Sequence, residues 1–148
     1  MTGSQNNMED IEIARRLLEE KRVNLVVVKE GQVLFSSKDS GLHTFFQLVL
    51  NSKRILHNAS VADRIIGLAA AMLCLHVKIT SVYADLASTG ALDILKKRGV
   101  NVINKNEVPH IYNYDGTDLC PFEQMAQKCK QPAQLISAME AFFAGSGL

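Results

Sequence analysis

The segment KITSVYADLASTGALDILKKRGVNVIN, residues 78–104, decides the fold because strand and helix patterns alternate along it. Residues 78–88 predict a strand of the kind that is covered on both faces. Residues 90–99 predict a helix, and residues 100–104 predict a short second strand. A strand, a helix and a strand in this order indicate two parallel strands that are joined by a crossover helix.

Turn and capping residues mark the element boundaries. Ser88 is suited to cap the helix that follows it, and Gly99 is suited to the left-handed conformation that ends many helices. Glu30-Gly31 separates two apolar runs within residues 23–37, which predicts a tight β-hairpin.

The remaining segments predict mainly helices. Apolar periodicity indicates helices over residues 8–21, 41–52, 59–76, from about 121, and from 132. A hairpin that is followed by strand–helix–strand units predicts an α/β fold with a mixed sheet between two helical layers. We expect a flexible tail over residues 1–7 and a single domain over residues 8–148.

Composition excludes several classes of function. The 148 residues are 47% hydrophobic and 21% charged, and the net charge of +1 gives no electrostatic basis for binding nucleic acid or an anionic membrane. Three cysteines without a close pair indicate a reducing compartment, and the apolar stretch 65–77 is too short to cross a bilayer. The start MTGSQNNMED does not resemble a signal peptide, so we expect a cytoplasmic protein; a homo-oligomer stays open.

Three stretches resemble a known family: ASVADRIIGLAAA, YADLASTGALDILKKRGVNV and DGTDLCPFE. They are similar to an uncharacterised bacterial family with a cytidine-deaminase-like fold, and the similarity extends from about Asp10 to Ala144. The resemblance implies a three-layer α/β/α architecture. It implies no settled activity, because the members of that family are of unknown function.

The ligands of a zinc deaminase are missing from the sequence. Such enzymes hold zinc with H-x-E and P-C-x-x-C motifs, whereas no histidine here precedes a glutamate by two and no C-x-x-C exists. In the resembled fold the two half-motifs open the helices that we place near Val61 and Thr89. The sequence therefore predicts a domain without zinc or another cofactor.

Polar residues near those two positions form a candidate ligand site. The set is Ser60, Asp63, Arg64, Asp85, Ser88, Thr89 and Gly90. Helix starts favour anions, hydroxyls and arginine donate to phosphate, and glycine permits close backbone approach. We expect the two helix starts to line one pocket for an anionic, nucleotide-like ligand. The alternative is that these side chains only cap helices.

Cys120 admits two interpretations. With Pro121 at the first helical position, Cys120 falls on the N-cap and Glu123 on the third position, which is the spacing of a capping box. A thiol at a helix start can also be reactive, but the nearby Glu123 disfavours the thiolate. We expect a capping role, with a reactive role as the alternative.

Three classes of function follow from the sequence. The first is a zinc-less deaminase-like domain that binds a nucleotide or a related phosphorylated small molecule, as a sensor or as an acceptor of modification. The second is a metal-independent enzyme that uses Asp63, Asp85 or Cys120. The third is a protein-interaction module with a vestigial site.

Overall fold

The computed structural model describes residues 3–39, 41–113 and 115–145. Within these residues a five-stranded sheet is surrounded by seven helices. In chain order the elements are α1 (Gly3–Glu20), β1 (Leu25–Lys29), β2 (Gln32–Ser37), α2 (Leu42–Asn51), α3 (Lys53–Leu56), β3 (Ser60–Ile66), α4 (Leu68–His76), β4 (Ser81–Ser88), α5 (Thr89–Lys97), β5 (Asn101–Val108), α6 (Pro121–Gln127) and α7 (Pro132–Gly145).

The sheet is mixed, with strand order β2-β1-β3-β4-β5. β1 pairs antiparallel with both β2 and β3, while β3, β4 and β5 are parallel. The parallel strands are joined through α4 and α5, as the pattern of residues 78–104 predicts. The predicted α/β fold with a mixed sheet is therefore confirmed.

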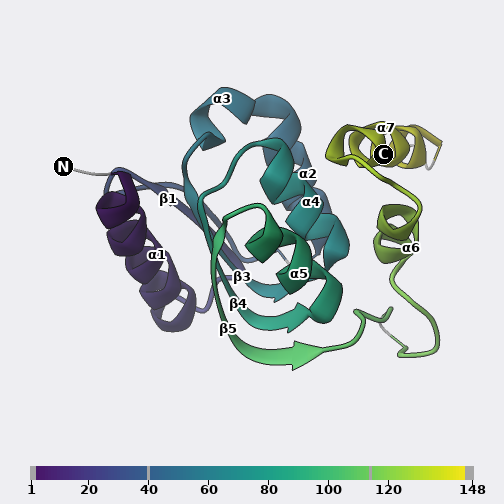
Figure 1. Ribbon diagram of the computed structural model, residues 1–148, viewed down its shortest axis with the longest axis horizontal. Helices are drawn as coiled ribbons and strands as arrows, with labels where there is room; N and C mark the ends of the chain where they lie inside the picture. The colour runs from purple at the N-terminus through teal and green to yellow at the C-terminus, as the bar shows by residue number, and fades with distance from the viewer. Residues whose placement is uncertain (1–2, 40, 114, 146–148) are drawn as a thin grey trace.

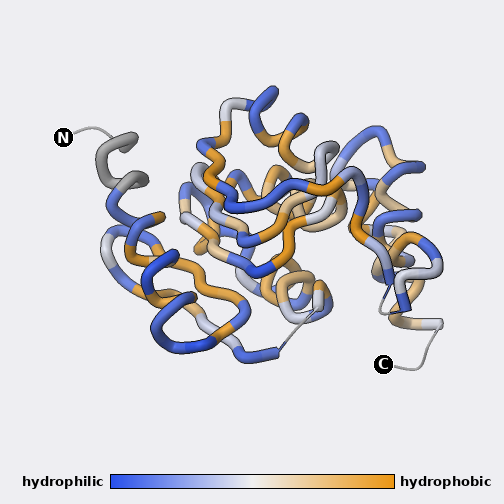
Figure 2. Tube along the Cα trace, turned by 90° about the horizontal axis from the view of Figure 1, so that it is seen from below, coloured by the Kyte–Doolittle hydropathy of each residue, from blue (hydrophilic) through white to orange (hydrophobic). Residues whose placement is uncertain are grey.

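The helices form two unequal layers (Figure 1). α1 covers one face of the sheet alone, and α2, α4 and α5 lie on the opposite face, with α6 and α7 packed against α4. Figure 2 shows hydrophobic and hydrophilic residues alternating along α1, as expected for a helix with one side against a sheet.

The hydrophobic core has two parts, one on each face of the sheet. β1 contributes to both, because Leu25 and Val27 lie in the larger cluster, whereas Val26 and Val28 face α1. All four side chains are buried, which confirms that this strand is covered on both sides.

The turn and capping predictions hold. Glu30 and Gly31 both have positive φ angles, 52° and 77°, and they connect β1 to β2 as a tight hairpin. The Ser88 side chain accepts a hydrogen bond from the backbone N–H of Ala91, so it caps α5. Gly99 has φ 82° just after α5 ends, as a left-handed helix end requires.

The helix that we expected over residues 59–76 is wrong in its first half. Residues 60–66 are strand β3, and the helix α4 begins only at Leu68. β1 and β4 flank this segment and satisfy its backbone groups, so sheet pairing overrides the apolar periodicity. α1 begins at Gly3, and residues 1–2 lie outside the described residues, so the flexible tail over residues 1–7 stays a prediction.

Candidate functional site

The carboxyl ends of β3 and β4 meet at one edge of the sheet, which we call the carboxyl edge. α4 starts there after Gly67, and α5 starts there after Ser88. A Cβ atom on Gly90 would lie 3.9 Å from Leu68 Cδ1, so the two helix starts are neighbours. The helix start that neighbours Ser88–Gly90 is at Leu68, whereas Ser60–Arg64, where we expected it, lies in strand β3.

The start of α4 already holds an anion, which is the side chain of Glu123. Its carboxylate accepts hydrogen bonds from the backbone N–H groups of Leu68, at 2.8 Å, and Ala69, at 3.0 Å. Glu123 is only 6% exposed. A Cβ atom at residue 67 would overlap with this carboxylate, so the contact requires Gly67. The chain therefore neutralises the positive end of α4 with its own carboxylate.

The capping box that we expected at the start of α6 does not form. Cys120 does occupy the N-cap position, with Pro121 after it, but its side chain makes no capping hydrogen bond. Glu123 points to the start of α4 and not back to its own helix. The reason is tertiary: the start of α4 offers a buried carboxylate two N–H donors at once.

The predicted site residues Arg64 and Asp85 lie on the α1 face of the sheet. Arg64 Nη1 donates to Asp85 Oδ2 at 2.9 Å, and Arg64 also donates to the backbone carbonyls of Leu18 and Val23. Tyr83 donates to the other oxygen of Asp85 at 2.7 Å. Burial alone would raise the pKa of Asp85, but the hydrogen bonds from Arg64 and Tyr83 hold it below its ordinary value. These groups satisfy one another and tie α1 to the sheet.

Asp63 lies on the opposite face of β3, towards α4. Burial raises its pKa to about 7, although hydrogen bonds from the backbone N–H groups of Ile65 and Arg64 act against this shift. Burial also raises the pKa of the Cys74 thiol on α4, and the charge of Asp63 adds to that effect. A carboxyl group with a pKa near 7 has the proton affinity of a general acid or base.

The other predicted residues lie at opposite ends of the sheet. Ser60 is buried at the amino end of β3, whereas Ser88, Thr89 and Gly90 lie at the carboxyl edge. Thr89 Oγ1 donates to Glu107 Oε2 at 2.9 Å or to the Val108 carbonyl at 3.3 Å. The predicted site residues therefore lie in several places and do not form one pocket. Ligand binding by these residues stays a prediction.

The residue types at the two helix starts do not fit a zinc site. Gly67, Leu68 and Ala69 stand at α4, and Ser88, Thr89 and Gly90 stand at α5. In the part of the chain that the structure describes, no group of three or more His, Cys, Asp or Glu side chains could hold a metal ion.

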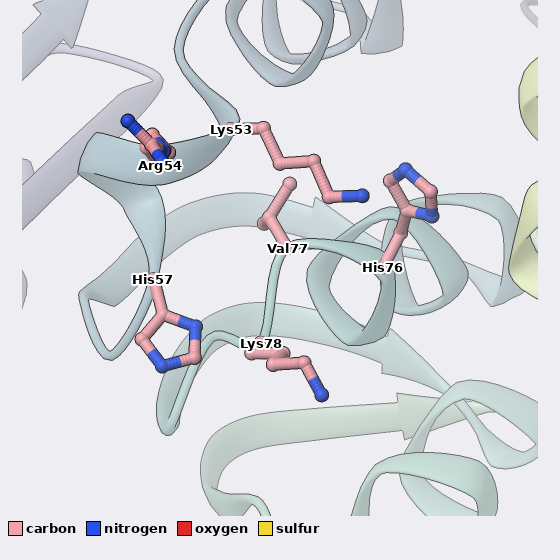
Figure 3. Close-up of a pocket in the computed structure, with 6 residues that line it drawn as sticks. All are labelled: Lys53, Arg54, His57, His76, Val77 and Lys78. Carbon is pink, nitrogen blue, oxygen red and sulfur yellow. The ribbon is translucent and has the colours of Figure 1, made fainter.

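A second candidate site lies at the opposite edge of the parallel strands, the amino edge. It is a cavity of about 320 Å³, which we call the basic groove (Figure 3). The lining residues are Lys53, Arg54, His57, His76, Val77 and Lys78. Five of the six carry basic side chains, and among the described residues none of these five forms an ion pair.

Backbone geometry brings the two halves of the basic groove together. Asn58, before β3, and Lys78, before β4, both adopt left-handed conformations, with φ angles of 67° and 61°. The N–H of Asn58 donates to the carbonyl of Lys78 at 3.0 Å, which links the two turns. Residues 53–57 and 76–78 are thereby placed side by side, although about 20 residues separate them in sequence.

Positive charge acts on His76 in the basic groove. Burial lowers the pKa of His76, and the positive charge of Lys53 lowers it further. In Figure 3 the Lys53 ammonium group points toward the His76 imidazole. Sequence reasoning missed this site because Lys53-Arg54 and Lys78 lie far apart in the chain and form no motif. Only the pairing of β3 with β4 brings them together.

None of the described helices is both long enough and apolar enough to span a membrane.

The structure resembles several solved structures. A crystal structure of a DUF1893 family protein, TM1506 from Thermotoga maritima, matches with a TM-score of 0.82 and 27% identity, and the match covers 91% of this chain and 90% of that chain. A dCMP deaminase from the cyanophage S-TIM5 matches with a TM-score of 0.43 and 17% identity, over 73% of this chain and 100% of that one.

A third match is a diaminohydroxyphosphoribosylaminopyrimidine deaminase/5-amino-6-(5-phosphoribosylamino)uracil reductase from Thermotoga maritima, with a TM-score of 0.45 and 14% identity, over 83% of this chain and 40% of that chain. The two deaminase likenesses are weak, so we take nothing about activity from them. No match was found among curated proteins.

The family model described as TM1506, domain of unknown function (DUF1893), matches residues 13–143. This match covers most of the chain and agrees with the likeness to the Thermotoga maritima structure. The predicted membership of an uncharacterised family is confirmed, and the chain belongs to the DUF1893 family.

Proposed function

We propose that this protein binds a phosphorylated small molecule, of the nucleotide class or related to it, in the basic groove. One observation supports the proposal above all others. Five basic side chains line one cavity, and no described acidic group pairs with them. Clustered like charges destabilise a folded protein slightly, and a bound phosphate would remove that repulsion.

The size and chemistry of the basic groove suit such a ligand. A volume of about 320 Å³ lies at the lower end of the range for small-molecule sites. Lys53, Arg54 and Lys78 supply permanent positive charges, and lysine and arginine are the usual donors to phosphate. The buried Val77 gives the cavity an apolar wall.

The predicted site residues at the carboxyl edge are less suited to an added anion. Glu123 supplies a negative charge at the start of α4, and Ser88 already caps α5. Arg64 uses its donors on Asp85 and on two carbonyls. An exogenous anion there would have to displace these partners.

A metal-independent enzyme is the second candidate, and Asp63 is the observation that favours it. Its pKa of about 7 suits proton transfer at neutral pH. Turnover of a nucleotide panel by the wild type, with loss of turnover in Asp63→Asn, would support this alternative. Full activity in that variant would exclude Asp63 as the acid or base.

Calorimetry tests the binding proposal directly. Wild-type protein is titrated with ADP, ADP-ribose and inorganic phosphate at low ionic strength, alongside Lys53→Ala and Lys78→Ala. The matched control is Lys97→Ala, an exposed lysine on α5 outside the basic groove. We expect the two groove variants to lose at least about tenfold in affinity and the control to bind as the wild type does. Equal affinity in all four proteins would contradict the proposed location.

A further inference from the structure

The side chains that line the basic groove include no carboxylate or amide group. They are two lysines, an arginine, two histidines and one valine. A nucleobase is recognised by donors and acceptors matched to its edge and by stacking on aromatic rings. The imidazoles and the guanidinium can stack on any base, but the lining has no carboxylate or amide to read the edge of a particular base. The chemistry therefore selects a ligand by its phosphate groups and not by the identity of its base.

The number of charges favours more than one phosphate group. Lys53, Arg54 and Lys78 together carry a charge of +3, and His57 and His76 add to it when they are protonated. A single phosphate group supplies at most two negative charges, so it leaves part of the repulsion in place. A diphosphate supplies three or four and matches the site more closely.

His76 is placed to respond to the ligand. Lys53, Arg54, His57 and Lys78 line the same cavity as His76. The positive charge of Lys53 acts on His76 and lowers the pKa of its imidazole. A phosphate group between these side chains would reverse the local field, because an opposite charge favours the protonated imidazole.

We propose that the basic groove selects its ligand by its phosphate groups, prefers a diphosphate to a monophosphate, and takes up a proton on His76 when the diphosphate binds. This inference rests on the proposed function, because it specifies the ligand of the same site.

The first experiment compares four probes by calorimetry: inorganic pyrophosphate, inorganic phosphate, ADP and adenosine. We expect pyrophosphate and ADP to bind with affinities within about threefold of each other. Both should bind at least about tenfold more tightly than phosphate, a difference that one additional charge-assisted hydrogen bond supplies. Adenosine should not bind.

The second experiment follows the imidazole Cε1–H resonances of the histidines by NMR as a function of pH, with and without pyrophosphate. His76 is assigned by the signal that is lost in His76→Gln. Pyrophosphate should move the titration midpoint of His76 to higher pH, and His57 should move in the same direction. His43, which stacks on Phe143, and His110 lie outside the basic groove and serve as internal controls that should not move.

The outcomes separate the two proposals. If none of the four probes binds, the proposed function and this inference are both wrong. If ADP binds more than tenfold more tightly than pyrophosphate, or if adenosine binds, a base is recognised and this inference alone is wrong. The inference is also wrong if phosphate binds as tightly as pyrophosphate, or if bound pyrophosphate leaves the His76 titration unchanged.

Discussion

The two edges of the parallel strands differ in whether the chain itself neutralises the charge found there. At the carboxyl edge, the positive end of α4 is neutralised within the chain by the buried carboxylate of Glu123. At the amino edge, five basic side chains line one groove, and no described acidic side chain pairs with them. A charge that the chain neutralises itself contributes to stability, whereas a charge left without a partner is available to a ligand. This difference is why we place the ligand at the amino edge.

Asp63 lies between these two cases. It is a half-buried carboxyl group, with Arg64 as a neighbour whose side chain points to the other face. Burial raises its pKa to about 7, so near neutral pH the native protein can avoid the buried charge by protonation. The molecule thus contains a paired charge, a charge that protonation removes, and a group of unpaired charges.

The largest effect is expected from Glu123→Ala. The substitution leaves two N–H groups at the start of α4 without an acceptor and opens a small cavity. We expect the free energy of unfolding to fall by about 2–4 kcal/mol, measured by urea denaturation. Glu123→Gln is the control, because it keeps the shape and one acceptor and should lose less. A change below about 0.5 kcal/mol in the alanine variant would show that the carboxyl edge does not depend on this charge.

A second large effect concerns pH and Asp63. Because the folded pKa of about 7 exceeds the ordinary value of 3.8, the native state holds this proton more tightly than the unfolded state does. The contribution of Asp63 is therefore fully present below pH 3.8 and is lost as the pH rises through about 7. One pKa unit corresponds to about 1.4 kcal/mol, so the loss is on the order of 4 kcal/mol, at the upper end of the range expected for Glu123→Ala.

Asp63→Asn tests that expectation. The amide cannot ionise, so the variant should be more stable than the wild type at pH 8 and nearly equal to it at pH 4. Urea denaturation across this range measures the difference at each pH. Parallel stability profiles for the two proteins would mean that Asp63 is ionised in the native state throughout.

Gly67→Ala should produce an intermediate effect. The added methyl group takes the place of the Glu123 carboxylate, so either the carboxylate or the start of α4 must move. We expect a loss of about 1–3 kcal/mol, as for other overpacked sites. In the Glu123→Ala background the same substitution should cost much less, since the obstructing group is gone. Additive losses in the double variant would disprove the direct contact.

The smallest effect belongs to the basic groove. Lys53→Ala and Lys78→Ala each remove one of several like charges, so each should raise the free energy of unfolding by a few tenths of a kcal/mol at low salt. The gain should vanish near 1 M salt, where the screening length is about 3 Å. Lys97→Ala on α5 is the control. If both groove variants destabilise the protein at low salt, mutual repulsion of the basic side chains at the amino edge does not lower its free energy of unfolding.

The sequence by itself determined the features that depend on neighbouring residues. The hairpin at Glu30-Gly31 follows from two residues that tolerate positive φ, and the Ser88 cap and the Gly99 helix end follow from equally local rules. The buried strand β1 is evident from its continuous apolar run, and β4 from its place in the crossover pattern. These local signals, with the crossover pattern, were sufficient for the fold class.

Only the tertiary structure decided the rest, because the deciding contacts join residues far apart in the chain. β3 has Asp63 and Arg64 in its middle and was mistaken for a helix, since its strand partners lie in β1 and β4. Glu123 reaches a helix start 54 residues earlier in the chain. The basic groove exists because the pairing of β3 with β4 sets the turn at Asn58 beside the turn at Lys78. Local propensity contains no information on such pairings, which long-range backbone hydrogen bonds and burial select.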